Sequence, residues 1–108
     1  MDTNQISPLE VKEKREEGEP FILLDVREPW EYQAAHIADS VLIPLGQLPS
    51  RMNELDPDKE IVTLCHHGIR SQTAMAFLAR AGFKNVKNLT GGIDAYSVTA
   101  DPTIPRYR

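Results

Sequence analysis

Residues 61–71 read Ile61-Val62-Thr63-Leu64-Cys65-His66-His67-Gly68-Ile69-Arg70-Ser71. Here an apolar run gives way to a short polar loop and then to a helix-like stretch, so Cys65 is expected at the carboxyl end of a strand and beside the amino end of a helix. Backbone N–H groups without intrahelical partners and the positive end of the helix dipole favour an anion at such a position. The thiol of Cys65, the only cysteine, should therefore lose its proton easily and act as a nucleophile.

Helix signals alternate with short apolar runs on both sides of this stretch. Ser7-Pro8-Leu9-Glu10 is a capping box with proline at the first helical position, and it predicts a helix from Pro8 to about Glu17 that Gly18 ends. The apolar run 21–26, with Asp25 near its carboxyl end, is typical of a strand buried on both faces. Further elements are expected as a helix over 29–35, a strand over 40–43, a helix over about 45–55, a helix over 71–81 closed by Gly82, a strand over 85–89 and a final helix opened by Gly92.

This alternation predicts an α/β fold in which helices cover both faces of a parallel sheet. Ligands in such folds sit outside the carboxyl ends of the strands. Asp25, Cys65 and the turn at 90–92 should therefore share one edge of the sheet.

Length and composition limit the classes of function. The 108 residues are expected to form a single domain, 1–108, with a core over about 5–97 and an extended tail over 98–108 that lies on the domain. A net charge of -4 and a pI near 5.3 argue against nucleic acid as a partner. One cysteine forms no internal disulfide, no signal-like segment begins the chain, and no apolar run approaches the roughly 18 residues of a membrane span. We expect a cytoplasmic protein with no membrane contact.

Six short motifs occur in a characteristic order and spacing. They are Asp25-Val26-Arg27-Glu28, Glu31-Tyr32, His36-Ile37, Ile43-Pro44, the loop from Cys65 to Ser71, and Gly91-Gly92-Ile93. Together they resemble the rhodanese-like, or sulfurtransferase, domain in its single-domain form. The resemblance implies a three-layer α/β fold with a mostly parallel sheet of about five strands. The segment 91–96, followed by Asp101-Pro102 and Pro105-Arg106-Tyr107, is similar to rhodanese domains fused behind adenylating enzymes of sulfur-carrier systems.

The chemistry that this resemblance implies is a sulfur relay. The Cys65 thiolate would attack a donor such as thiosulfate, hold the sulfur as a persulfide, and pass it to a thiol or cyanide acceptor. No cofactor is needed beyond that covalent intermediate. The loop that would bind the persulfide consists of His66, His67, Gly68, Ile69, Arg70 and Ser71, with its N–H groups aimed at the sulfur. Arg70, and the histidines when protonated below about pH 6.5, would supply positive charge.

Three functional classes stay open: a small-molecule sulfurtransferase, a protein-to-protein persulfide carrier, and a non-catalytic binding module. The carrier would serve tRNA thiolation or sulfurated cofactor synthesis, with a cysteine desulfurase or a sulfur-carrier protein as partner. The presence of Cys65 weighs against the non-catalytic module. Free cysteines are often small buried hydrophobes, but the glycine and arginine that follow Cys65 favour a thiol that is not buried.

Two alternative interpretations of the Cys65 loop, as a phosphatase-type oxyanion site and as a metal site, are less favoured by the sequence. A cysteine phosphatase or arsenate reductase embraces its oxyanion with a loop one residue longer, whereas only four residues separate Cys65 from Arg70. The shorter ring suits one sulfur atom better than a phosphate group. A metal site at Cys65, His66 and His67 is disfavoured because zinc ligand pairs are usually spaced by about two to four residues.

Other polar and aromatic residues are expected to have structural roles. Asp25 is interpreted as a supporting residue that pairs with a loop arginine or accepts backbone N–H groups. His36 should bond the backbone near its own turn. The remaining expectations are a surface turn at Arg27 and Glu28, packing of Trp30 and Tyr32 in the core, and a tight backbone approach at Gly91 and Gly92.

Overall fold

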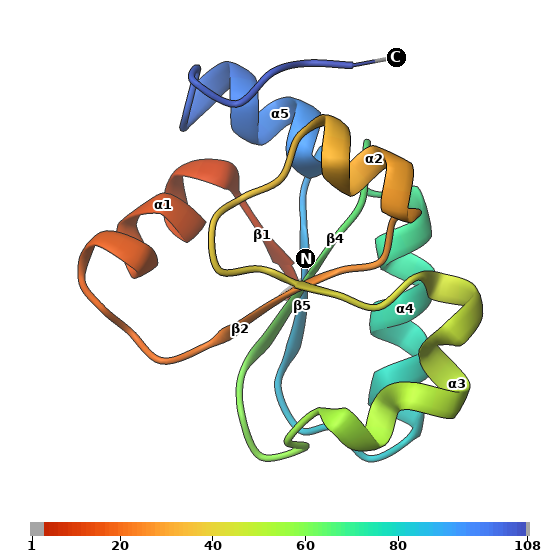
Figure 1. Ribbon diagram of the computed structural model, residues 1–108. Helices are drawn as coiled ribbons and strands as arrows, with labels where there is room; N and C mark the ends of the chain where they lie inside the picture. The colour runs from red at the N-terminus through yellow and green to blue at the C-terminus, as the bar shows by residue number, and fades with distance from the viewer. Residues whose placement is uncertain (1–3, 108) are drawn as a thin grey trace.

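A five-stranded parallel sheet runs through the middle of the molecule in the computed structural model, which describes residues 4–107 (Figure 1). The strand order is β1-β5-β4-β2-β3, and each neighbouring pair is parallel. This confirms the predicted α/β architecture, although residues 1–3 and 108 of the expected single domain lie outside the described residues. The strands are β1 (Gln5–Ile6), β2 (Ile22–Asp25), β3 (Val41–Leu42), β4 (Ile61–Leu64) and β5 (Val86–Leu89).

The register of the central strands brings the polar turns to one edge of the sheet. Asp25, the last residue of β2, pairs with Leu64, the last residue of β4, so Asp25 and Cys65 lie at the same edge. The turn that follows β5 reaches the same place, because the N–H of Ile93 donates to the carbonyl oxygen of Cys65 at 2.8 Å. The predicted convergence of these three turns is confirmed.

Five α-helices within residues 4–107 surround the sheet. The capping box at Ser7 is formed, and Glu17 caps the first helix just before Gly18. The helix expected over about 45–55 is instead split into two 3₁₀ turns around a short helix. Pro49 lacks the N–H that a helix continuing from the first turn would need, and Arg51, with a φ of -120°, departs from helical geometry before the second turn. The helices are α1 (Pro8–Glu16), α2 (Pro29–Ala34), α3 (Leu48–Arg51), flanked by the 3₁₀ turns Leu45–Gln47 and Met52–Glu54, α4 (Ile69–Arg80) and α5 (Gly92–Thr99).

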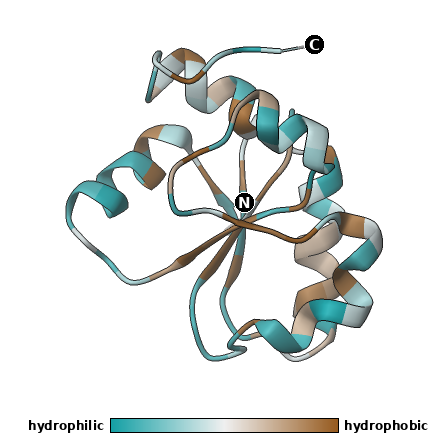
Figure 2. Ribbon diagram, viewed as in Figure 1, coloured by the Kyte–Doolittle hydropathy of each residue, from teal (hydrophilic) through white to brown (hydrophobic). Residues whose placement is uncertain are grey.

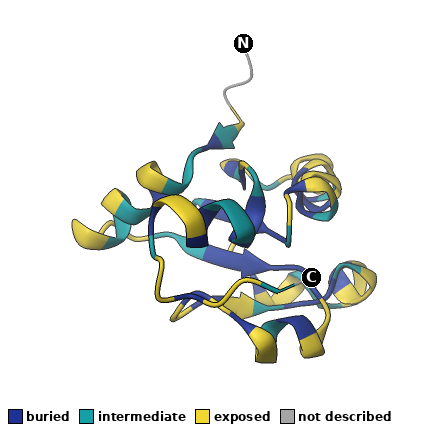
Figure 3. Ribbon diagram, turned by 90° about the horizontal axis from the view of Figure 1, so that it is seen from above, coloured by how far each residue is buried: buried dark blue, intermediate teal, exposed yellow. Residues whose placement is uncertain are grey.

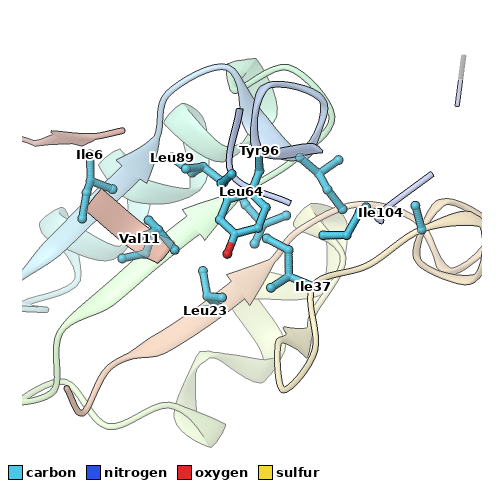
Figure 4. Packing of buried hydrophobic residues seen from close by; sticks show 12 residues of the cluster. Ile6, Val11, Leu23, Ile37, Leu64, Leu89, Tyr96 and Ile104 are labelled. Carbon is cyan, nitrogen blue, oxygen red and sulfur yellow. The ribbon is translucent and has the colours of Figure 1, made fainter. Parts of the chain in front are cut away.

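The hydrophobic core consists of two clusters, one on each face of the sheet, because neighbouring residues of a strand point to opposite sides. Leu23 belongs to the cluster under α1 and α5, whose side chains point toward one another in Figure 4, and Leu24 belongs to the cluster under α3 and α4. Figure 2 shows the apolar strands at the centre and the polar surface of α1, and Figure 3 shows the buried strands between the helical layers. Cys65 belongs to the second cluster.

The tail after α5 lies on the domain, as predicted, and passes over α5 toward α2 (Figure 1). Ile104 is buried in the first core cluster, and Arg106 pairs with Asp94 of α5 at 2.8 Å. The tail begins at residue 100, since residues 98 and 99 still belong to α5. Within residues 4–107, no helix has the length and apolar character needed to cross a membrane.

Candidate active site

The sulfur of Cys65 lies in a cup formed by the loop between β4 and α4. The N–H groups of Gly68 and Ser71 point at Sγ from 3.1 and 3.4 Å, and the Ser71 hydroxyl oxygen lies 3.4 Å from it. Gly68 makes this curl with a φ of 98°, in the left-handed region that glycine tolerates. It also starts α4 at Ile69, two residues earlier than expected, so both N–H groups belong to the first turn region of that helix.

The expectation that Cys65 would not be buried is wrong, because its exposed fraction is 1%. The side chain belongs to the second core cluster, which also contains Leu24 and Val26, and the N–H groups of Gly68 and Ser71 point at its sulfur. Sequence reasoning took the glycine and arginine of the loop as signs of exposure, but the loop presents Ile69 to solvent, at 79% exposed, and turns its amides inward. Only a small part of Cys65 is therefore open to an approaching reagent.

The first turn of α5 fixes the loop from the other side. The N–H groups of Ile93 and Asp94 donate to the carbonyl oxygens of Cys65 and His66. Gly92 makes this approach possible, since a Cβ atom at that position would overlap with both carbonyl oxygens. The predicted tight approach of this glycine pair is confirmed, and it leaves the peptide groups of Cys65 and His66 little freedom.

Two polar residues within the strands support the cup, and sequence reasoning missed both. Asn88 of β5 donates to the carbonyl oxygen of Gly68 at 3.2 Å and accepts the proton of the Ser71 hydroxyl. Thr63 of β4 donates to the carbonyl oxygen of Ser71 at 2.9 Å. Both side chains are buried, so their hydrogen bonds hold the loop in one conformation. The available signal was a polar side chain within each strand, Thr63 in Ile61–Leu64 and Asn88 in Val86–Leu89.

Arg70 forms a two-point ion pair with Glu31 of α2. The distances are 2.6 Å from Nη1 to Oε1 and 2.8 Å from Nη2 to Oε2. The hydrogen bonds from Arg70 lower the pKa of Glu31 to about 2, against an opposing contribution from burial, and the same pair raises the pKa of Arg70. Sequence reasoning placed Glu31 in a motif without a role and treated the charge of Arg70 as free, whereas Glu31 offsets much of it.

Asp25 and Arg27 form a second ion pair, and both side chains are fully buried. Arg27 donates to the Asp25 carboxylate from Nε and Nη2 at 2.8 and 2.6 Å, and its backbone N–H also donates to Oδ1. Asp25 therefore has the structural contacts that were predicted. The expected surface position is correct for Glu28 but wrong for Arg27, whose side chain is buried. The guanidinium of Arg27 also donates hydrogen bonds to the backbone carbonyl oxygens of Glu31 and Ala35.

Aromatic rings line the outer side of the loop. The His66 ring lies between His67 and Tyr107, with ring centroids 4.0 and 4.1 Å away. Burial, followed by the neighbouring His67, lowers the pKa of His66, so His66 is neutral at neutral pH and supplies no positive charge there. Trp30 meets Tyr107 edge-on at 5.8 Å but is 60% exposed, so the expectation that it packs in the core is wrong.

His36 lies just after α2 and contacts Tyr32 of that helix. His36 forms the predicted hydrogen bond to the backbone, with Nδ1 3.0 Å from the carbonyl oxygen of Tyr32, and its ring stacks on Tyr32, which is half-buried.

Among residues 4–107, no three His, Cys, Asp or Glu side chains gather in a group that could hold a metal ion.

Comparison with known proteins gives one consistent result. A family model described as "Rhodanese-like domain" matches residues 7–99. A protein of Bacillus subtilis named "Putative sulfurtransferase YtwF" is 39% identical over 102 residues, which cover 94% of this chain and 98% of that protein. "Thiosulfate sulfurtransferase GlpE" of Pseudomonas syringae is 36% identical over 95 residues, which cover 88% of each. The crystal structure of a rhodanese-related protein from Thermoplasma volcanium has a TM-score of 0.84 at 31% identity, covering 96% of this chain and 99% of that one.

Some relatives are much longer than this chain. "Adenylyltransferase and sulfurtransferase MOCS3-2" of Zea mays is 37% identical over 110 residues, which cover 95% of this chain but only 23% of that protein. The predicted similarity to domains fused to adenylating enzymes is therefore confirmed at the level of sequence.

Proposed function

Since this chain belongs to the rhodanese-like domain family, we propose that it transfers sulfane sulfur from a donor such as thiosulfate to a thiophilic acceptor through a persulfide on Cys65. Sulfur transfer in general is supported by the family and by relatives named sulfurtransferases. The observation that carries the proposal is the cup of N–H groups from Gly68 and Ser71 around the sulfur of Cys65. Such donors stabilise a thiolate or a persulfide anion.

The proposed reaction has two steps. In the first step the Cys65 thiolate attacks the outer sulfur of thiosulfate, the sulfur–sulfur bond of the donor breaks, and sulfite leaves with the electron pair. In the second step a cyanide or thiolate acceptor attacks the outer sulfur of the persulfide, and the Cys65 thiolate leaves. The amides of Gly68 and Ser71 would hold the anion throughout. Because Cys65 is almost fully buried, only a small part of its side chain is open to the donor and the acceptor.

The test is a mass measurement on the reduced protein. Incubation with thiosulfate should add about 32 Da per sulfur, and subsequent addition of cyanide should remove that mass and release thiocyanate. Cys65→Ser should show neither effect. Robust turnover by Cys65→Ser, or no mass gain by the unchanged protein, would exclude the proposed reaction.

A protein-to-protein persulfide carrier is the second candidate. It is favoured by the similarity of 95% of this chain to part of a protein named for adenylyltransferase and sulfurtransferase activities. The carrier would be loaded by a cysteine desulfurase. The Cys65 thiolate would attack the outer sulfur of the desulfurase persulfide, the sulfur–sulfur bond of that persulfide would break, and the desulfurase cysteine would leave as a thiolate. Fast loading by a desulfurase with slow loading by thiosulfate would favour the carrier, and the opposite order would favour the small-molecule enzyme.

A further inference from the structure

Tyr107 links two charged groups that lie far from it in the sequence. Its hydroxyl oxygen is 2.9 Å from Nη1 of Arg27 and 2.7 Å from Oε2 of Glu31. A guanidinium only donates and a carboxylate only accepts, so the hydroxyl accepts from Arg27 and donates its single proton to Glu31. Glu31 in turn binds Arg70. Tyr107 is therefore the neutral link between the buried Asp25–Arg27 pair and the Glu31–Arg70 pair.

The surroundings of Tyr107 hold its hydroxyl in one place. Arg27 cannot shift, because its side chain is fully buried and is also bonded to Asp25 and to two carbonyl oxygens. The Tyr107 ring is stacked on His66, with an interplanar angle of 12°, and Trp30 meets it at 82°. The phenol is consequently a fixed hydrogen-bond donor to Glu31.

This fixed donor acts on the same carboxylate oxygen as Arg70. Oε2 of Glu31 accepts from Tyr107 and from Nη2 of Arg70. Without the phenol, Glu31 loses a partner that limits its rotation and offsets part of its negative charge. Arg70 directly precedes Ser71, whose N–H points at the sulfur of Cys65 at 3.4 Å. A less fixed Arg70 and a less compensated Glu31 would therefore both make the cup less favourable to an incoming anion.

We propose that Tyr107 is a positioning residue, which holds Glu31 and thereby Arg70 so that the Cys65 cup accepts anionic sulfur donors. This assignment extends the proposed function, because it rests on an anionic donor reaching Cys65. Tyr107 thereby adds a residue of the C-terminal tail to the site, beside the residues of the loop motif.

The experiment compares Tyr107→Phe with the unchanged protein. The phenylalanine keeps the ring stacked on His66 and removes only the hydroxyl. We expect the KM for thiosulfate to rise about fivefold, less than the full effect of one hydrogen bond to a charged group because Tyr107 acts through Glu31, while kcat changes less than about twofold. Arg70→Ala removes the guanidinium itself and so shows how far the KM for thiosulfate rises when Arg70 makes no contribution. Tyr32→Phe is the matched control, because its hydroxyl bonds the carbonyl oxygen of Ser40, away from the cup.

A second measurement separates this proposal from the proposed function. Iodoacetate and iodoacetamide alkylate thiols, and they differ mainly in charge, so the ratio of their rates at Cys65 reports how well the cup accepts an anion, even if no sulfur is ever transferred. We expect Tyr107→Phe to lower the iodoacetate-to-iodoacetamide ratio about threefold or more, with no change in Tyr32→Phe. An unchanged ratio, or equal slowing of both reagents in a variant that thermal melting shows to be folded, would overturn the positioning role. Absence of sulfur loading with the ratio shifted would instead overturn only the proposed function.

Discussion

The guanidinium of Arg70 and the carboxylate of Glu31 are joined by two parallel hydrogen bonds, which tie the first turn of α4 to α2. The pKa of Glu31 is about 2 in the folded protein, below its ordinary value of 4.5 in an unfolded chain. The charged carboxylate therefore stabilises the fold fully above about pH 4.5. This stabilisation is lost as the pH falls toward 2.

Glu31→Gln should remove that pH dependence. The free energy of unfolding of the unchanged protein should fall by about 2 kcal/mol more than that of Glu31→Gln between pH 5.5 and pH 3. Urea denaturation at a series of pH values measures both curves, and the other carboxylates contribute equally to the two proteins. Parallel curves would show that the ion pair adds nothing to stability.

The buried pair of Asp25 and Arg27 should couple strongly. Asp25→Asn leaves a buried cation without its counter-ion, and Arg27→Met leaves a buried anion, so each should cost about 3–5 kcal/mol. The double variant should cost clearly less than the two added together. Asp58 and Lys84 form a matched exposed pair at 3.0 Å, for which the same cycle should give less than about 1 kcal/mol. Equal coupling energies in the two cycles would contradict the structural assignment.

Gly92 should tolerate no side chain. Gly92→Ala places a Cβ against the carbonyl oxygens of Cys65 and His66 and also strains a φ of +65°. Gly18→Ala is the control, since its φ is +70° and nothing lies within 4 Å of the added atom. We expect about 1 kcal/mol of destabilisation for Gly18→Ala and more than about 3 kcal/mol for Gly92→Ala, measured by urea denaturation. Similar losses would mean that φ alone limits position 92.

The stacking of Tyr107 on His66 should be visible in the titration of His66. Burial disfavours the charged imidazole, so its midpoint in NMR should lie below the ordinary value of about 6.5. Tyr107→Ala should raise the midpoint toward that value by letting water reach the ring, whereas Tyr107→Phe should leave it low. A midpoint that is the same in all three proteins would show that the stacked ring does not shield His66.

The fold and the position of Cys65 were predictable because their signals are local. The apolar run before Cys65, the capping box at Ser7 and the glycines 18 and 82 each mark an element within a few residues. The strand β1 gave no periodicity because it has only two residues. The helix α4 begins two residues earlier than expected because Gly68, with its positive φ, acts as the cap.

The supporting contacts were not predictable because they depend on side chains that are distant in sequence or hidden by burial. Tyr107 is separated from Arg27 and Glu31 by 80 and 76 positions. A charged residue just after a strand, such as Arg27, normally indicates a surface turn, and only the fold shows that Asp25 compensates its charge. The burial of Cys65 was missed for a similar reason, since its cover comes from residues of several elements.

The outermost strands of the sheet, β1 and β3, contain two residues each. Edges this short expose few unpaired N–H and C=O groups, so another extended chain finds few hydrogen-bond partners there. The domain is thereby protected against strand exchange with a neighbour. Such protection would let the same unit be joined in tandem to other folded domains, as in the long relative that carries adenylyltransferase in its name, without the sheets of the two merging.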